Sequence, residues 1–355
     1  MSKLKELIRE LCPDGVEYKE LQAILKIKNG SDYKAYGEGD IPVYGSGGIM
    51  TYIDRYVYNK PSVLIPRKGS IDKLYYVDTP FWNVDTIFYT EINTDLAIPR
   101  YVYHCLLREH LEQYNTAGGV PSLTQKVLNK IQIPLPPLEV QSEIVRILDK
   151  FTELTAELTA ELTARKKQFE YYRDNLLEFE DKTVYQTMDS VLKIKNGSDY
   201  KKLKYGRVPV YGSGGIMTYV DTYSFSKPSV LIPRKGSIDK LYYVDTPFWN
   251  VDTIFYTDID NKKAIPKFIY YCLQKSHLEQ YNTAGGVPSL TQKVLNKILI
   301  PIPSLNVQER IVKILDRFYF LCNDISNGIP AEIEARQKQY EFYRDKLLTF
   351  KEKRC

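Results

Sequence analysis

Residues Lys60 to Thr90 read KPSVLIPRKGSIDKLYYVDTPFWNVDTIFYT, and residues Lys227 to Thr257 repeat this stretch letter for letter. Residues His110 to Ile131 recur in the same way as His277 to Ile298. The offset between the copies is 167 residues in both blocks (227 − 60 and 277 − 110). Solenoid repeats recur every ~20–50 residues, so this period is too long for a solenoid. The chain therefore carries two copies of one complete module, and with them two copies of one binding surface.

The first part of each copy predicts a compact domain with strands and short helices. Apolar runs such as Val63-Leu64-Ile65 lie between turn signals such as Asn29-Gly30, which is typical of short strands. We expect four segments along the chain. They are domains at residues 1–137 and 183–304, and helical spacers at residues 138–182 and 305–355.

Each spacer predicts a long helix, because its apolar residues recur at spacings of three and four. About 40 residues at 1.5 Å each span roughly 60 Å. Gly328 and Pro330 predict a break in the second helix. The second helix can bury its apolar stripe on the first only by running antiparallel to it. The predicted fold class is α+β: two globular domains separated by two long antiparallel, coiled-coil-like helices with pseudo-twofold symmetry.

The first spacer contains a tetrapeptide repeat, Thr-Ala-Glu-Leu at 155–158 and again at 159–162. One interpretation is a surface helix made of residues with high helix propensity. We favour a second interpretation, a spacer whose length changes in steps of one helical turn, about 6 Å per tetrapeptide.

Composition places the chain among globular proteins of the cytoplasm. Of its residues 43% are hydrophobic and 26% charged, and no apolar run reaches the ~18 residues of a membrane span. The net charge of +5 favours polyanionic partners only mildly. Five cysteines and three histidines are scattered without metal-ligand spacing, so no metal site is predicted.

No group of residues predicts catalysis or a cofactor. The turn Gly45-Ser46-Gly47-Gly48 matches neither the dinucleotide nor the P-loop pattern. Hydrolase and metalloprotease motifs are absent from the sequence. Trp82 and Trp249 occupy equivalent positions in the two copies, and we expect both to be core residues.

Basic and hydroxyl side chains cluster after the strand at residues 62–66. Arg67, Lys68, Ser70 and Lys73 recur in the second copy as Arg234, Lys235, Ser237 and Lys240. Such a loop suits contacts to phosphate and bidentate recognition of guanine. The alternative is a solvated turn. The Gly-containing loop at residues 115–122 and its copy at 282–289 either bind phosphate through backbone amides or only connect two elements.

Five segments resemble, in this order, the target recognition domain of type I restriction–modification specificity (S) subunits and the start of its helical spacer. They are VYGSGG at 43–48, LIPRKGS at 64–70, FWNVDT at 81–86, GVPSLT at 119–124 and IPLPPLEVQ at 133–141. The resemblance covers the whole chain, including the order of domain, helix, domain and helix.

The resemblance implies a non-catalytic subunit without a cofactor that reads a bipartite site in double-stranded DNA. It also implies two copies of an adenine methyltransferase (M) subunit as partners, and restriction/translocase (R) subunits for cleavage. The implied candidates for DNA contact are Tyr44, Ser46, Arg67, Lys68, Ser70 and Lys73, with Tyr211, Ser213, Arg234, Lys235, Ser237 and Lys240. The candidates for partner contact are Phe151, Leu158, Leu162, Phe318 and Leu321 on the predicted helices.

The chain departs from the family pattern in one respect. Family members commonly carry two different recognition domains, whereas residues 41–90 and 208–257 differ at only six of fifty positions. Two like domains in inverted orientation predict a target made of inverted repeats around a non-specific gap. Two alternatives remain: a recognition fragment of a nuclease or methyltransferase, and a tandem module that binds carbohydrate or protein. Binding to phosphate should weaken steeply with salt, whereas binding to a sugar should not.

Overall fold

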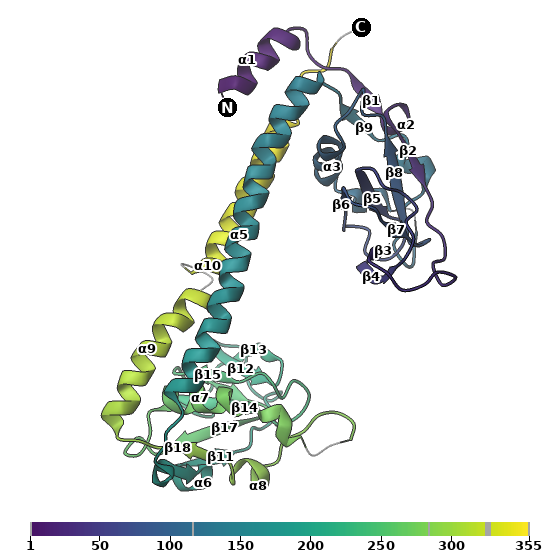
Figure 1. Cartoon of the computed structure of the whole chain (residues 1–355). Coiled ribbons are helices and arrows are strands. Elements are labelled where there is room, and N and C mark those ends of the chain that lie inside the picture. The colour runs from purple at the N-terminus through teal and green to yellow at the C-terminus, as the bar shows by residue number, and fades with distance from the viewer. Residues whose placement is uncertain (1, 116, 283–284, 324–327, 354–355) are drawn as a thin grey trace. The chain divides into compact units, whose positions relative to one another are not determined.

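The chain folds into two compact units, each built around one copy of the repeat. Unit 1 comprises residues 1–158 and 333–355, and unit 2 comprises residues 159–332. The computed structural model describes residues 2–115, 117–282, 285–323 and 328–353 (Figure 1). Within these ranges, no helix has both the length and the apolar character needed to cross a membrane.

Unit 1 begins with a helix and continues as a mixed domain that ends at the long helix α5. Its elements are α1 (Ser2–Leu11), β1 (Tyr18–Glu20), α2 (Leu21–Ile24), β2 (Leu25–Lys28), β3 (Ile41–Gly45), β4 (Gly48–Ile53), β5 (Ser62–Pro66), β6 (Tyr75–Val77), β7 (Trp82–Asn83), β8 (Ile87–Ile92), α3 (Pro99–Arg108), the 3-10 helix η1 (Leu111–Tyr114), α4 (Gln125–Leu128), β9 (Gln132–Pro134) and α5 (Leu138–Leu176).

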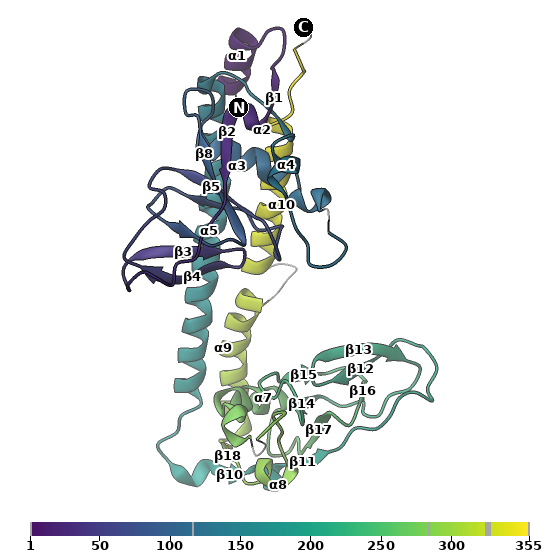
Figure 2. The ribbon, with the colours of Figure 1, turned by 90° about the vertical axis from the view of Figure 1, so that its right-hand side faces the viewer.

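Three sheets form the domain of unit 1. The four-stranded sheet has the antiparallel order β2-β8-β5-β6, and a three-stranded sheet has the order β4-β3-β7, in which β3 and β7 are parallel. β1 pairs with β9. Successive side chains of a strand point to opposite faces, and in β5 both faces are covered. Val63 and Ile65 join the core cluster with α3 and α5, whereas Leu64 joins a second cluster with Phe81 and Ile87. The three-stranded sheet lies at the end of the domain far from α1 (Figure 2).

Unit 2 repeats this domain with the same sheet orders. Its elements are η2 (Lys182–Val184), β10 (Tyr185–Thr187), α6 (Met188–Val191), β11 (Leu192–Lys195), β12 (Val208–Gly212), β13 (Gly215–Val220), β14 (Ser229–Pro233), β15 (Tyr242–Val244), β16 (Trp249–Asn250), β17 (Ile254–Ile259), α7 (Pro266–Lys275), η3 (Leu278–Tyr281), α8 (Gln292–Leu295), β18 (Leu299–Pro301) and α9 (Leu305–Asn323). A last helix, α10 (Ile329–Leu347), belongs mostly to unit 1.

The long helices pair in antiparallel fashion, as predicted. In unit 1 the Phe151 ring of α5 stacks on Tyr343 of α10, with ring centroids 5.2 Å apart. In unit 2 the Tyr172 ring of α5 stacks on Phe318 of α9, also at 5.2 Å. Partner numbers fall as the numbers on α5 rise, which defines the antiparallel direction. The predicted helix break is confirmed, since α9 ends at Asn323 and α10 begins at Ile329, and residues 324–327 lie outside the described part of the chain.

A buried glutamine fastens each domain to its helix. Gln141 of α5 accepts a hydrogen bond from Ile98 N at 2.9 Å, and its amide donates to the carbonyls of Leu96 and Pro136 at 2.9 and 2.8 Å. Gln308 of α9 makes the equivalent three contacts in unit 2. Buried polar groups are costly when unpaired, so a fully paired glutamine specifies how each helix seats on its domain.

Candidate nucleic-acid interface

Four segments of unit 1 meet at one edge of the domain and form what we term loop cluster 1. They are the β3–β4 turn (45–48), the loop after β5 (67–73), the turn after β7 (84–86) and the loop before α4 (117–123). Backbone hydrogen bonds join them: Gly69 N donates to Pro121 O at 3.0 Å, and Leu123 N donates to Arg67 O at 2.9 Å. The cluster is therefore a built surface and not a set of independent loops.

Thr86 is the centre of this network. Its carbonyl accepts from the backbone N–H of Arg67 at 2.8 Å and of Lys68 at 3.2 Å. Its hydroxyl accepts from Ser46 N at 3.3 Å. Gly69 adopts φ +88°, a left-handed conformation that favours glycine, and a Cβ there would meet Ser46 Oγ at 3.3 Å. The basic loop consequently lies directly against the β3–β4 turn.

The basic candidates differ in how firmly they are held. The Arg67 guanidinium donates to Asp85 O at 3.4 Å and lies over the Phe88 ring, 5.9 Å from its centroid. A guanidinium has five N–H donors, so this anchoring leaves donors for a ligand. Lys68 and Lys73 are exposed, and neither has an ion-pair partner among the residues that the structure describes. One oriented arginine suits base contact, and two exposed lysines suit phosphate contact.

The remaining candidates mainly support the cluster. Tyr44 is half-buried, with its ring 5.9 Å from that of Tyr75, and burial raises the pKa of its hydroxyl. Ser46 carries the carbonyl that accepts from Tyr75 Oη at 3.2 Å. Ser70 is half-buried and its carbonyl accepts from Lys73 N at 3.3 Å. Trp82 is a core residue, as predicted, and its indole N–H donates to Ser31 O at 3.0 Å. Trp249, predicted to be a core residue too, is only half-buried against the core of unit 2.

Loop cluster 2 of unit 2 comprises residues 212–215, 234–240, 251–253 and 285–290, and reproduces this network. Thr253 O accepts from the backbone N–H of Arg234 and Lys235 at 2.8 and 3.3 Å, and Gly236 N donates to Pro288 O at 3.0 Å. The Arg234 guanidinium lies 5.8 Å from the Phe255 ring centroid. Tyr211, Ser213, Ser237 and Lys240 occupy the positions of their counterparts in unit 1.

Sequence reasoning missed three residues that build the cluster. Thr86 and Tyr75 connect its loops, and the Asn115 carboxamide oxygen accepts from the backbone N–H of Ala117 and Ser122 at 3.1 and 2.9 Å. All three lie inside the letter-identical blocks, and this identity was the signal available. The Thr86 and Tyr75 side chains bond to backbone atoms of Ser46, 40 and 29 residues away, which no local pattern predicts. The Asn115 contacts are local and lie within its own loop.

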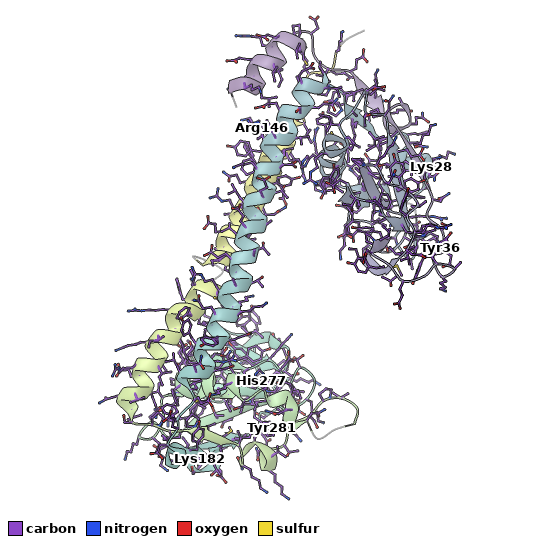
Figure 3. All side chains as sticks on the ribbon, in the orientation of Figure 1. Lys28, Tyr36, Arg146, Lys182, His277 and Tyr281 are labelled. Atoms are coloured by element: carbon purple, nitrogen blue, oxygen red, sulfur yellow. The ribbon has the colours of Figure 1, made fainter. Side chains whose placement is uncertain are left out.

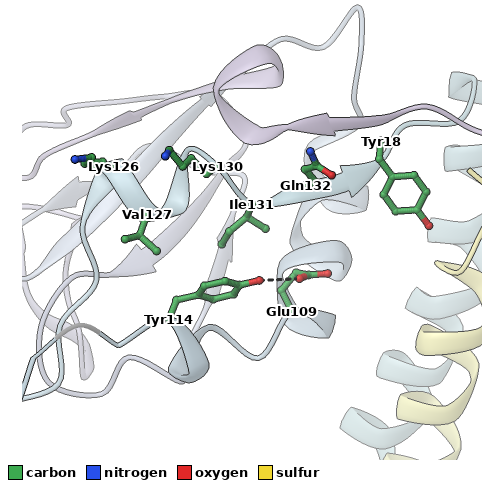
Figure 4. A pocket seen from close by; sticks show the side chains of 8 residues that line it. All are labelled: Tyr18, Glu109, Tyr114, Lys126, Val127, Lys130, Ile131 and Gln132. Atoms are coloured by element: carbon green, nitrogen blue, oxygen red, sulfur yellow. Dashed lines mark hydrogen bonds between the residues drawn. The ribbon is translucent and has the colours of Figure 1, made fainter. Parts of the chain in front are cut away.

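A pocket beside loop cluster 1 adds two further lysines. It has a volume of about 760 Å³ and is lined by Tyr18, Glu109, Tyr114, Lys126, Val127, Lys130, Ile131 and Gln132 (Figure 4). The Tyr114 hydroxyl donates to Glu109 Oε2 at 3.3 Å. The equivalent pocket of unit 2 measures about 650 Å³ and is lined by Tyr281, Lys293, Val294, Lys297, Ile298 and Leu299. Both pockets therefore place a lysine pair next to the loops.

The predicted partner contacts lie on the helices but are unequally accessible. Phe151 and Phe318 are half-buried in the ring stacks described above, and Leu158 and Leu162 are half-buried on α5. Leu321 on α9 is exposed.

The two copies are identical over long blocks that include the loop clusters, and they differ on the helices α3 and α7. The blocks from Lys60 to Thr90 and from His110 to Ile131, which include the buried strand β5, are letter-identical to their counterparts. By contrast α3 and α7, PRYVYHCLLR and PKFIYYCLQK, differ at six of ten positions. Three of these, Tyr101/Phe268, Val102/Ile269 and His104/Tyr271, are fully buried in both units. The parts that the two units share to the letter thus include the loop clusters and the strand β5 that leads into the basic loop.

Comparison with known proteins identifies the family. The model of the type I restriction modification DNA specificity domain matches residues 13–165 and 180–335. A Haemophilus influenzae chain named as a type I restriction enzyme specificity subunit is 32% identical, covering 94% of this chain and 96% of its own length. The EcoR124I/EcoR124II specificity subunit of Escherichia coli is 36% identical over 74% of this chain and 73% of its own.

Solved structures agree on the fold. The type I restriction–modification S subunit from M. genitalium superposes with a TM-score of 0.62 at 17% identity, covering 94% of this chain and 96% of that one. With the family model matching both copies of the repeat, the chain belongs to the family of type I restriction–modification DNA specificity subunits.

Proposed function

We propose that this chain reads a bipartite site in double-stranded DNA, with loop cluster 1 on one half-site and loop cluster 2 on the other. The observation that carries the proposal is the duplicated network around Thr86 and Thr253, which presents the same exposed cations twice. In this proposal Arg67 and Arg234 contact bases. Lys68, Lys73, Lys235 and Lys240 contact phosphates, and Tyr44, Ser46, Ser70, Tyr211, Ser213 and Ser237 shape the contact surface.

The two half-sites in this proposal are identical and inverted. Their identity rests on the identical loop sequences, and their inversion rests on the antiparallel direction in which α5 pairs with α10 and with α9. The chain itself carries no catalytic group in this proposal. Two M subunits methylate adenine on either half-site, and R subunits add cleavage, in the cytoplasm. Leu321 contacts a partner, whereas Phe151, Leu158, Leu162 and Phe318 hold the helices that present the partner surface.

Salt dependence of DNA binding tests the proposal. The chain in complex with its methyltransferase should bind a target duplex with a steep salt dependence, because each phosphate contact contributes about −0.9 to the log–log slope. Lys68→Ala combined with Lys235→Ala should reduce that slope by about 2 units. Lys5→Ala, at an exposed position of α1, is the matched control and should leave the slope unchanged. Binding that does not respond to salt would contradict the proposal and favour a carbohydrate or protein ligand.

A further inference from the structure

A β-bulge distorts the β3–β4 hairpin next to the turn that belongs to loop cluster 1. The register shifts between Val43 and Tyr44, and Met50 of β4 is left without a partner on β3. An extra residue of this kind bends its strand and re-aims the side chains around it. The turn also uses a left-handed glycine, Gly48, at φ +118°. β3 and β4 lie side by side at one end of the domain (Figure 1, Figure 2).

Two large apolar side chains are exposed at this bulge. Ile49 is 49% exposed and Met50 is 57% exposed. The hairpin itself is well packed, because Val43 is fully buried in a cluster with Trp82. The ring of Tyr36 (labelled in Figure 3) covers that cluster, with its centroid 4.7 Å from that of Trp82. A firmly held hairpin therefore presents an apolar pair to solvent.

The Met50 side chain reaches back to the first residue of the hairpin turn, Gly45. A Cβ at Gly45 would lie 2.7 Å from Met50 Sδ and 3.5 Å from Thr86 Oγ1. The lack of a side chain at Gly45 is what admits the thioether to this place. Thr86 also holds the basic loop, since its carbonyl accepts from the backbone N–H of Arg67 and Lys68. The apolar side chain thus lies within loop cluster 1, beside the arginine that we propose to contact bases.

Unit 2 repeats this arrangement in the hairpin of β12 and β13, which has the same register shift. Ile216 and Met217 are 51% and 56% exposed. A Cβ at Gly212 would lie 2.6 Å from Met217 Sδ and 3.5 Å from Thr253 Oγ1. Residues 43–52 and 210–219 are letter-identical. We name residues 49–50 apolar pair 1 and residues 216–217 apolar pair 2, and each belongs to its own loop cluster.

We propose that apolar pair 1 and apolar pair 2 pack against the C5-methyl group of thymine in the major groove of their half-sites. The major groove admits a two-stranded β-ribbon, and the thymine methyl is the apolar group that base pairs present there. The guanine atoms that suit the neighbouring arginine lie in the same groove. The inference rests on the proposed function, in which adenine is methylated on either half-site. Each half-site then contains at least one A·T pair.

The other candidate occupant of these side chains is a second copy of the chain. β4 is an edge strand, and exposed apolar edges are sites where sheets associate. DNA is the better match because the apolar pair shares its loop cluster with the exposed cations Lys68 and Lys73. A second copy would bring the same cations to the contact, and like charges repel. A polyanion that also carries apolar methyl groups complements both features.

Deoxyuridine tests the proposal, because it lacks only the C5-methyl group of thymine and pairs with adenine in the same way. The chain in complex with its methyltransferase is titrated with the target duplex that methylation mapping identifies. Deoxyuridine in place of thymine within one half-site should weaken binding about fourfold for each methyl contact. The same replacement in the gap is the control and should change nothing. Equal binding of thymine and deoxyuridine half-sites would overturn the inference, whereas the salt dependence of the same duplexes reports on the proposed function separately.

A variant of the chain identifies the side chains responsible. Met50→Ala combined with Met217→Ala should weaken binding of the thymine duplex and should respond less to deoxyuridine, because the two changes remove the same contact. Tyr56→Ala combined with Tyr223→Ala, at exposed positions outside the loop clusters, should keep the full response. Melting temperatures should stay unchanged, since all four side chains are about half exposed. A full deoxyuridine response in the methionine variant would overturn the proposal, as would a change in its oligomeric state alone.

Discussion

Unit 1 and unit 2 share their loop clusters to the letter but differ where the domain helix packs on the long helices. In unit 1, buried His104 of α3 lies between Tyr340 Oη of α10 at 2.9 Å and Asp149 Oδ1 of α5 at 3.0 Å. The equivalent position in unit 2 is Tyr271, whose hydroxyl donates to Asp316 Oδ1 at 2.5 Å. The difference teaches that the same loop clusters are compatible with two different contacts between a domain and its long helices. The duplication retains the loop clusters and the strand β5, whereas the side chains of α3 and α7 vary.

The largest expected effect comes from changing the spacer between the two copies. Deleting Thr159–Leu162 removes about one turn, roughly 6 Å, from α5. At ~3.4 Å per base pair, the gap between half-sites should shorten by one to two base pairs, and the parental target should no longer be methylated. Methylation mapping of the variant measures this.

Substitution without a change of length is the control. Thr159→Ser combined with Ala160→Glu keeps the helix length and should keep the parental gap. A deletion variant that still modifies the parental target would show that these tetrapeptides form only a surface helix.

The next effect concerns a feature that both units share. Gln141→Leu and Gln308→Leu each remove three hydrogen bonds and leave buried backbone groups unpaired. Each variant should lose about 3 kcal/mol in the free energy of unfolding. Chemical denaturation measures the loss, and Gln337→Leu at an exposed position of α10 should cause almost none. If only one of the two variants lost free energy of unfolding to this extent, the two domain–helix contacts would not be equivalent.

The loop clusters should respond equally to the same substitution. Arg67→Ala and Arg234→Ala should each weaken specific DNA binding by about 2 kcal/mol, roughly 30-fold, because each removes one bidentate base contact. The double variant should lose specific binding altogether. Competition between target and random duplexes measures the specificity. Full specificity in the double variant would remove these arginines from the interface.

The smallest expected effect is a pH dependence of stability that His104 gives to unit 1 and that Tyr271 does not give to unit 2. Burial lowers the pKa of His104 below the ordinary value of a histidine, and a hydrogen bond to Asp149 opposes this. The folded state therefore keeps His104 neutral while the unfolded state takes up a proton. Unit 1 should accordingly lose stability as the pH falls below the ordinary histidine pKa of about 6.5. Tyr271 stays neutral in this range, because burial raises its pKa.

His104→Tyr recreates the unit 2 arrangement in unit 1 and should remove this pH dependence. Thermal unfolding at pH 7.5 and pH 5.5 measures it, with Tyr271→Phe as the control in unit 2. An equal acid destabilisation with and without His104 would assign the effect to other groups, such as Asp149. That carboxyl is buried in part, but hydrogen bonds from His104 and Arg100 hold its pKa below the ordinary value.

Much of the fold could be predicted because it depends on periodicity and repetition. The 3.6-residue pattern predicted α5, and Gly328 with Pro330 predicted the separation of α9 from α10. The antiparallel pairing followed from the need to bury an apolar stripe. The split between α3 and the 3-10 helix η1 has no such signal, because it depends on His110, which adopts φ 46° between them.

The candidate interface was less predictable, for a physical reason. Arg67 and Lys68 could be found from their strand-end position, but Thr86 could not. Its role depends on hydrogen bonds to segments 19 and 40 residues away in sequence (86 − 67 and 86 − 46).

Methylation mapping tests the central claim most directly. The chain is co-expressed with its cognate methyltransferase, and every modified adenine is located by long-read sequencing. Two identical loop clusters on antiparallel helices predict one inverted-repeat motif with a fixed gap. Two unrelated half-sites, a direct repeat, or no motif in the presence of active methyltransferase would contradict the claim.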